Sequence, residues 1–191
     1  MNFTDLRFLR TQEQFQNALL ELLETKELKE ITVKEICDKA NMSRNAFYQH
    51  YGYKEDLYDQ MVAKATERIR ESLTPIIPDI SHLKKDTIQV YAKGIIDAVA
   101  EVHDLIYVML KSDDGTFMRQ LTDLIFGQFF TYALPFFNIE DSEELRLYYE
   151  FLSAGLSAFI IKWIVDDNVS EEKALGLLTD IFLQTSTKVP G

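Results

Sequence analysis

Apolar residues recur at helical spacing along most of the chain. The pattern predicts a first helix over residues 4–25, with Phe8, Phe15 and Leu19 on its buried side. A second long helix is expected over 54–73. We see no period-two alternation typical of strands, so we predict an all-α fold.

A proline pair divides the pattern into two parts. Pro75 and Pro78 cannot continue a helix, and the segment around them marks a domain boundary. We therefore expect a domain over 1–53, a linking helix over 54–73 and a second domain over 74–191. Further helices are predicted over 81–102, 104–111, 116–134, 142–165 and 170–185.

The helix over 142–165 is apolar on both sides. Between Glu150 and Asp166 its only charge is Lys162. We judge it too short for a membrane span of ~20 residues, and we expect its second apolar side to pack on another subunit. The predicted dimer interface, completed by the last helix, comprises Leu152, Leu156, Phe159, Trp163, Leu178 and Ile181.

Residues 31–57 carry two sets of helix-start signals. Thr32 and Glu35 have the spacing of a capping box. Asn41, which tolerates the left-handed conformation, follows the first short helix, and Ser43 can cap the next. These signals predict a helix-turn-helix, whose second helix can enter a DNA major groove.

The second short helix has an inner and an outer side. Phe47 and Tyr51 are expected to face inward. The residues expected to stay outside are Arg44, Asn45, Tyr48, Gln49 and His50.

The order of residues in this segment resembles the DNA-binding motif of TetR/AcrR-type transcriptional regulators. The resemblance covers roughly the first 70 residues, and Glu27 stands where family members commonly have Gly. It is carried by Ile36, Ala40, Ser43, Phe47-Tyr48, His50-Tyr51 and Lys54–Leu57. It implies an all-α, TetR-like homodimeric regulator, a repressor rather than an activator, with an N-terminal three-helix domain and a C-terminal ligand-binding and dimerisation domain.

The resemblance also implies roles at a two-fold related, double-stranded DNA site. Ser43, Tyr48, His50 and Lys54 are expected to contact phosphates. Thr32 is expected to add a further backbone contact. Arg44, Asn45 and Gln49 are candidates for reading base edges.

Aromatic residues gather in the C-terminal part. For any one of them the simplest interpretation is core packing; the alternative, implied by the resemblance, is a pocket for a small apolar or amphipathic effector. Our candidate pocket residues are Tyr91, Tyr107, Phe126, Phe130 and Tyr148.

Two other functions stay open. The link TKELKEITV and the short C-terminal part also resemble a branch of co-activators with a protein partner, which includes dihydroxyacetone kinase regulators. An all-α enzyme with a vestigial helix-turn-helix is a more distant possibility.

The net charge of −11 at first argues against a nucleic-acid partner. However, residues 1–70 hold 11 basic and 12 acidic residues, so most of the acidity lies in the C-terminal part. DNA affinity depends on the local face, and acidity elsewhere limits non-specific binding. The N-terminus lacks an apolar signal core, so we expect a cytoplasmic protein that is not bound to a membrane.

Other chemistry finds little support. Cys37, the only cysteine, lies on an apolar helix face and is expected to be a packed core residue. There is no Gly-rich phosphate loop, CxxC or HExxH, and His50, His82 and His103 are far apart. We expect no enzyme activity, cofactor or metal.

Overall fold

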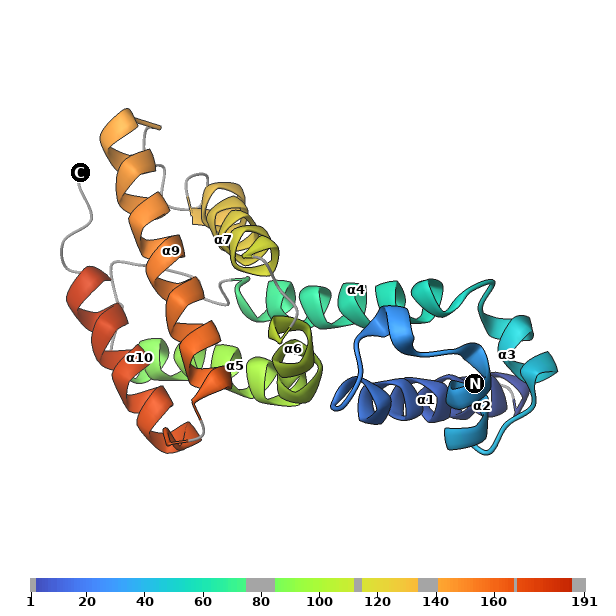
Figure 1. Ribbon diagram of the computed structural model, residues 1–191. Helices are drawn as coiled ribbons and strands as arrows, with labels where there is room; N and C mark the ends of the chain where they lie inside the picture. Colours follow the sequence, from blue (N-terminus) through green and yellow to red (C-terminus); the bar gives the residue numbers. More distant parts are fainter. Residues whose placement is uncertain (1–2, 75–84, 112–114, 134–140, 167, 187–191) are drawn as a thin grey trace. The chain divides into compact units, whose positions relative to one another are not determined.

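The computed structural model describes residues 3–74, 85–111, 115–133, 141–166 and 168–186 (Figure 1). These residues form helices and connections without strands, which confirms the all-α prediction. The first elements are α1 (Phe3–Leu23), the short 3-10 helix η1 (Leu28–Glu30), α2 (Val33–Lys39), α3 (Arg44–His50) and α4 (Lys54–Ser72). The later ones are α5 (Lys85–Glu101), α6 (His103–Leu110), α7 (Thr116–Gln128), a π-helical turn η3 (Phe129–Ala133), α9 (Glu143–Val165) and α10 (Glu171–Ser186).

The chain divides into two compact units. The N-terminal unit comprises Met1–Ala65 together with Asp104–Ser112, and the C-terminal unit comprises Thr66–His103 with Asp113–Gly191. The predicted division at 53 and 74 stays a prediction. Pro75 and Pro78, on which it rested, lie outside the described residues.

The core of the N-terminal unit is built from one stripe of each helix. Phe15, Ile36, Phe47 and Leu57 are fully buried there, and they come from α1, α2, α3 and α4. α6 adds Val108 to the same cluster. Four amphipathic helices of these lengths are stable only when their apolar stripes meet, so this core fixes where α3 lies.

Phe8 departs from the sequence prediction. We placed it on the buried side of the first helix, but 46% of the residue is exposed. By helical spacing, Phe8 belongs to the same stripe of α1 as Phe15 and Leu19. At that end of α1 the core has run out, so helical periodicity alone overestimates the buried length.

In the C-terminal unit, α5 packs against α10 and α7 packs against α9. The predicted helix over 116–134 ends differently, because after Gln128 it continues as the π-helical turn η3. Gln128 is buried there and donates to the carbonyl of Arg70, with 2.9 Å between Nε2 and the oxygen. A single π-turn is not specified by a 3.6-residue pattern, so the sequence could not predict it.

Helix α9 begins and ends where the sequence indicated. Ser142 caps it by accepting from the Leu145 amide, and Asp166 ends it. The judgement that this helix is too short to span a membrane is wrong: at 23 residues α9 is, within the described ranges, the one helix with the length and composition to cross a membrane, and a third of that stretch is buried in the chain. A core helix of a soluble protein has the same properties, so this is weak evidence for a membrane span.

Candidate nucleic-acid interface

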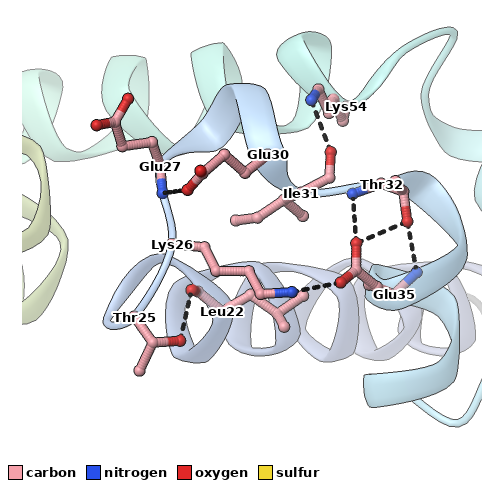
Figure 2. Close-up of polar contacts among 9 residues, drawn as sticks. All are labelled: Leu22, Thr25, Lys26, Glu27, Glu30, Ile31, Thr32, Glu35 and Lys54. Atoms are coloured by element: carbon pink, nitrogen blue, oxygen red, sulfur yellow. Dashed lines mark hydrogen bonds and ion pairs between the residues drawn. The ribbon is translucent and has the colours of Figure 1, made fainter.

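Helix α2 starts with the predicted capping box (Figure 2). Thr32 Oγ1 accepts from the Glu35 amide at 3.2 Å, and the Glu35 carboxylate accepts from the Thr32 amide at 2.9 Å. Lys26 Nζ also contacts Glu35, at 2.5 Å. These hydrogen bonds, from Lys26 first and Thr32 second, lower the pKa of Glu35 to about 2. The start of α2 is therefore fixed by polar contacts that only the ionised carboxylate can accept in full.

The turn between α2 and α3 also follows the prediction. Asn41 has a φ of 52°, the left-handed conformation that Asn tolerates. The Met42 amide donates to the Cys37 carbonyl at 2.9 Å. Ser43 then caps α3 by accepting from the Ala46 amide at 3.1 Å. The turn thus reverses the chain and aims the start of α3 away from α2.

Helix α3 has the two sides that its sequence indicated. Phe47 is fully buried, edge-on to Phe15 with ring centroids 5.3 Å apart. The opposite side is exposed, and 58% of Tyr48 is accessible. The other predicted DNA contacts that are exposed are Thr32, Ser43, Arg44, Asn45 and Gln49. The structure therefore gathers the predicted base-reading residues on one solvent-facing side of a short, rigidly anchored helix.

His50, a predicted phosphate contact, is half-buried. Its ring stacks on that of Phe8, with centroids 4.0 Å apart. Burial lowers the pKa of His50 below its usual 6.5. Neutral imidazole is therefore favoured in the free protein, and a phosphate contact would oppose this shift by favouring the charged form. The stacking on Phe8 was missed by sequence reasoning, which placed Phe8 in the core.

Lys54 occupies an unexpected place. Its Nζ donates to the carbonyls of Leu28 at 2.7 Å, Ile31 at 2.6 Å and Lys29 at 3.3 Å. Only 16% of the side chain is exposed. These partners lie 23 to 26 residues earlier in the chain, so no local spacing could have indicated them. The predicted phosphate contact of Lys54 stays a prediction.

The connection from α3 to α4 is held by one carboxylate. Asp56 Oδ2 accepts from the amides of Gly52 at 2.9 Å and Tyr53 at 3.0 Å. A side chain added at Gly52 would lie 3.0 Å from the same oxygen, which favours glycine there. The end of α3 is thereby fixed to the first turn of α4.

Several basic side chains of this unit are already paired. Lys26 pairs with Glu35, and Lys39 pairs with Glu21. Arg44 forms no salt bridge within the described ranges, and it is exposed. A cation without a carboxylate partner is available for phosphate or guanine, so Arg44 gives the exposed side of α3 its positive charge.

Two tyrosines of the predicted pocket have internal partners. The Tyr91 hydroxyl donates to the Leu73 carbonyl at 3.0 Å, and the Tyr148 hydroxyl donates to the Thr185 carbonyl at 2.9 Å. Burial raises the pKa of both phenols. Both side chains therefore serve the packing of their own unit, whatever ligand the unit takes.

The other candidate pocket residues fall into two places. The rings of Phe126 and Phe130 pack at a tilt, with centroids 4.6 Å apart, in the C-terminal unit. Tyr107 belongs to the N-terminal unit and is 37% exposed, so the predicted set is not one cluster. A cleft of about 320 Å³ in the N-terminal unit is lined by other residues, Leu28 and Val108 among them.

The residues of the predicted dimer interface differ in burial, and their role in a dimer stays a prediction. Leu156 and Leu178 are buried in their own chain, and Leu152, Phe159 and Trp163 are half-buried. Ile181 is exposed at 43%. The most exposed apolar residues of α9 are Phe151 at 74% and Leu147 at 70%, from the other stripe. Because α9 is apolar all round, its sequence could not show which stripe faces its own core.

The cysteine and one further histidine also lie at defined places. Cys37 is buried in the core of the N-terminal unit, as predicted, and burial raises the pKa of its thiol. His103 lies near Ile164, with 3.2 Å from its Nε2 to the carbonyl oxygen, and His82 is outside the described residues. In the part of the chain that is described, no three His, Cys, Asp or Glu side chains gather as metal ligands.

Comparison with known proteins agrees with this geometry. Residues 17–61 match the family model described as bacterial regulatory proteins, tetR family. A curated protein of Bacillus subtilis (strain 168), the uncharacterized HTH-type transcriptional regulator YxbF, is 38% identical over 71 residues. The match spans 37% of this chain and 19% of that relative.

Solved structures share the fold of the whole chain. A putative TetR-family transcriptional regulator from Syntrophomonas wolfei str. Goettingen superposes with a TM-score of 0.70 at 11% identity, over 95% of this chain and 97% of that one. The dihydroxyacetone kinase operon activator DhaS gives 0.62 at 15% identity, over 95% and 98%. At these identities the likeness shows the fold alone, and that fold is TetR-like.

Proposed function

We propose that this chain, a TetR-type transcriptional regulator by its N-terminal domain and its fold, binds a two-fold related DNA site as a homodimer and represses the neighbouring genes. One observation carries the proposal. The buried side of α3 is fixed by Phe47 and the Ser43 cap, while Arg44, Asn45, Tyr48 and Gln49 all remain exposed on its other side. A short anchored helix with free polar side chains is what major-groove reading needs.

The exposed residues divide by chemistry. Arg44 can bond a guanine edge in bidentate fashion, and Asn45 and Gln49 can do the same at adenine. The hydroxyls of Ser43 and Tyr48 suit phosphate oxygens, as does the backbone at Thr32. His50 can donate one N–H to a phosphate oxygen as a neutral imidazole, and its charged form, which would bind phosphate more strongly, is disfavoured by burial, which lowers its pKa.

Dimerisation is supported by the exposed side of α9. Phe151 and Leu147 are more than two-thirds exposed there, an unusual state for side chains of this size. Ala154, Gly155 and Ala158 are also exposed on α9, and such small residues allow a second helix to approach closely. A symmetric pair of chains would present two equal copies of α3, which accounts for a two-fold related site.

Repression would be relieved by a small apolar or amphipathic effector in the C-terminal unit. The tilted ring pair of Phe126 and Phe130 offers apolar surface, and the Arg146 guanidinium, which pairs with Asp141, lies 5.0 Å from the Phe130 ring. Such an effector changes DNA affinity only if it prefers one arrangement of the chain over another. Its identification requires a screen by thermal shift.

A second candidate is a co-activator controlled by a protein partner. It is favoured by the internal hydrogen bonds of Tyr91 and Tyr148, since these hydroxyls are not free to orient a small ligand. Co-purification from the native cell separates the two: a stoichiometric protein partner would favour the co-activator.

Selection of genomic DNA fragments by the purified chain tests the proposal. We expect enrichment of one or a few two-fold related sites. The double variant Arg44→Ala, Gln49→Ala should lose the enrichment while unfolding at the same temperature. Lys93→Ala, which also removes one positive charge but lies on α5, should keep it. A folded wild-type chain that enriches nothing would contradict the proposal and favour an enzyme or another activity.

A further inference from the structure

We propose that Phe8 is a positioning residue for DNA binding, which holds the imidazole of His50 so that its Nε2 can donate to a phosphate. The proposal rests on the DNA-binding function above and adds a residue from outside the helix-turn-helix. It starts from the contact between the two rings, which stack with centroids 4.0 Å apart and planes at 27°.

Phe8 contributes little to the core of its unit. It lies about two helical turns before Phe15 on the same stripe of α1. Phe15 is fully buried, whereas 46% of Phe8 is exposed and Phe8 is not part of the core cluster. A half-exposed phenylalanine removes only part of its apolar area from water. The flat face of Phe8 therefore covers His50, while the core is closed by Phe15.

His50 lies among three aromatic rings. Besides Phe8, Phe15 meets the imidazole edge-on at 6.2 Å, and Tyr51 lies at a tilt with centroids 6.0 Å apart. In these surroundings Nδ1 of His50 is fully covered and has no hydrogen-bond partner among the described residues. Nε2 is not covered in this way, so it is the ring nitrogen that a phosphate can reach.

The covered Nδ1 decides which hydrogen bond His50 can make. A neutral imidazole donates from one nitrogen only, and phosphate oxygens only accept. A phosphate at Nε2 therefore selects the tautomer whose proton is on Nε2. The charged form would place a second N–H on Nδ1, where no described residue offers an acceptor, and this is costly.

The titration of His50 agrees with this geometry. Its pKa is lowered from 6.5, and burial is the cause; no neighbouring charge contributes to the shift. Of the three rings around it, only that of Tyr51 titrates, and burial raises the pKa of that phenol above its usual 10. His50 is therefore a neutral donor at neutral pH.

Stacking on Phe8 also limits the orientations of the imidazole. A histidine in the last turn of a short helix could otherwise adopt several rotamers, and DNA would have to select one of them. Ordering a side chain on binding weakens affinity, so a ring that is already oriented binds more tightly. A residue of α1 thus presets a phosphate donor at the end of α3 without contacting DNA itself.

Phe8→Ala tests the contact in the free, full-length protein. NMR titration gives the pKa of His50, whose signal is identified among the three histidines by its loss in His50→Ala. The pKa should rise towards 6.5 in Phe8→Ala, because water reaches the ring. Leu9→Ala truncates a side chain of α1 with a similar exposure of 41% and should leave this pKa unchanged. Equal pKa values of His50 in the wild type and in Phe8→Ala would overturn the proposal.

Affinity for the selected site at pH 8, where the imidazole is neutral, tests the role in DNA binding. Phe8→Ala and His50→Ala should each weaken binding about two- to tenfold, which corresponds to one hydrogen bond. The double variant should bind no more weakly than His50→Ala, because Phe8 acts through His50. Additive losses would overturn the proposal, and so would wild-type affinity of Phe8→Ala.

A conservative variant guards against a general loss of stability. Phe8→Tyr keeps the stacked ring, so both the pKa of His50 and the affinity should match those of the wild type. Weak binding by a folded Phe8→Tyr would overturn the proposal. The NMR titration uses no DNA: if Phe8→Ala raises the pKa but the wild type selects no DNA, the proposed function fails while the contact between Phe8 and His50 stands.

Discussion

The helix-turn-helix and helix α9 use their large apolar residues in opposite ways. In the first, Phe47 turns inward onto Phe15, and both are fully covered by the same chain. In α9, Phe151 and Leu147 turn outward and remain mostly exposed. The first region is complete within one chain. The second leaves apolar side chains exposed, which is the reason for our proposal that it contacts a second copy.

Their polar residues, by contrast, are used in similar ways. Around α2 and α3, Thr32, Glu35 and Ser43 bond backbone groups at helix starts. In the C-terminal unit, the described ion pairs, such as Lys93 with Asp97, are exposed and contribute little. Side chains there also bond backbone groups, as Ser142 does at the start of α9 and Tyr148 does at the Thr185 carbonyl. The two regions therefore differ in the exposure of their apolar residues and not in the use of their polar ones.

Phe47→Ala should produce the largest effect, because it empties the centre of the N-terminal core. We expect the free energy of unfolding to fall by about 3–5 kcal/mol, measured with denaturant. Its neighbour Tyr48→Ala, on the exposed side, should change it by only about 0.5 kcal/mol. Similar losses for the two variants would mean that the sides of α3 are not distinct.

Phe151→Glu tests the exposed side of α9 and should weaken self-association by about 2 kcal/mol or more. Sedimentation should show monomers with an unchanged helix content. Glu150→Gln, at the adjacent exposed position, should leave the dimer intact. A well-folded dimer of Phe151→Glu would remove α9 as the interface.

Arg44→Ala examines the exposed side of α3. Discrimination between bases at one position of the site should fall by ~1–3 kcal/mol, with little change on random DNA. Competition binding with single-base variants of the selected site measures it. Equal losses on selected and random DNA would make Arg44 a phosphate contact.

Thr32→Ala removes the cap of α2 and should cost about 1 kcal/mol in unfolding free energy. Thr25→Ala is the matched control, because its hydroxyl makes only a long contact of 3.4 Å to the Leu22 carbonyl. The unfolding free energy of the control should stay within about 0.5 kcal/mol of that of the wild type. If the two variants are equally stable, the capping box does not stabilise the region.

Lowering the pH should reveal a smaller contribution of Glu35 to the free energy of unfolding. Its pKa is lowered from 4.5 to about 2, so the folded state binds the proton less readily than the unfolded state. The stability from its charged form is therefore fully present above about pH 4.5 and is lost as the pH falls towards 2. Glu35→Gln should flatten the pH dependence of unfolding in that range. An unchanged profile would contradict this role.

Local signals account for what the sequence predicted. The capping box at Thr32, the left-handed Asn41, the Ser43 cap and the bounds of α9 depend on residues a few positions apart, and all are confirmed. The exposed side of α3 followed from helical spacing alone. Each of these features is fixed within a few turns of chain, where spacing is a sufficient guide.

Long-range packing accounts for what could not be predicted. The hydrogen bonds from Lys54 to the carbonyls of Leu28 and Ile31, and the stacking of Phe8 on His50, join segments more than twenty residues apart. The assignment of Leu156 to the core and Phe151 to the surface depends on which neighbour α9 meets. A helix that is apolar on both sides gives no local indication of which side will be buried. A single lysine likewise gives no indication of which distant carbonyls it will contact.

Methylation interference on the selected site tests the central claim, that α3 reads the major groove, most directly. Methylation of guanine N7 marks the major groove, and methylation of adenine N3 marks the minor groove. We predict that N7 methylation blocks binding at two symmetric positions about one helical turn, or 10 base pairs, apart. Wild-type binding in the presence of N7 methylation, with interference only at adenine N3, would contradict the account.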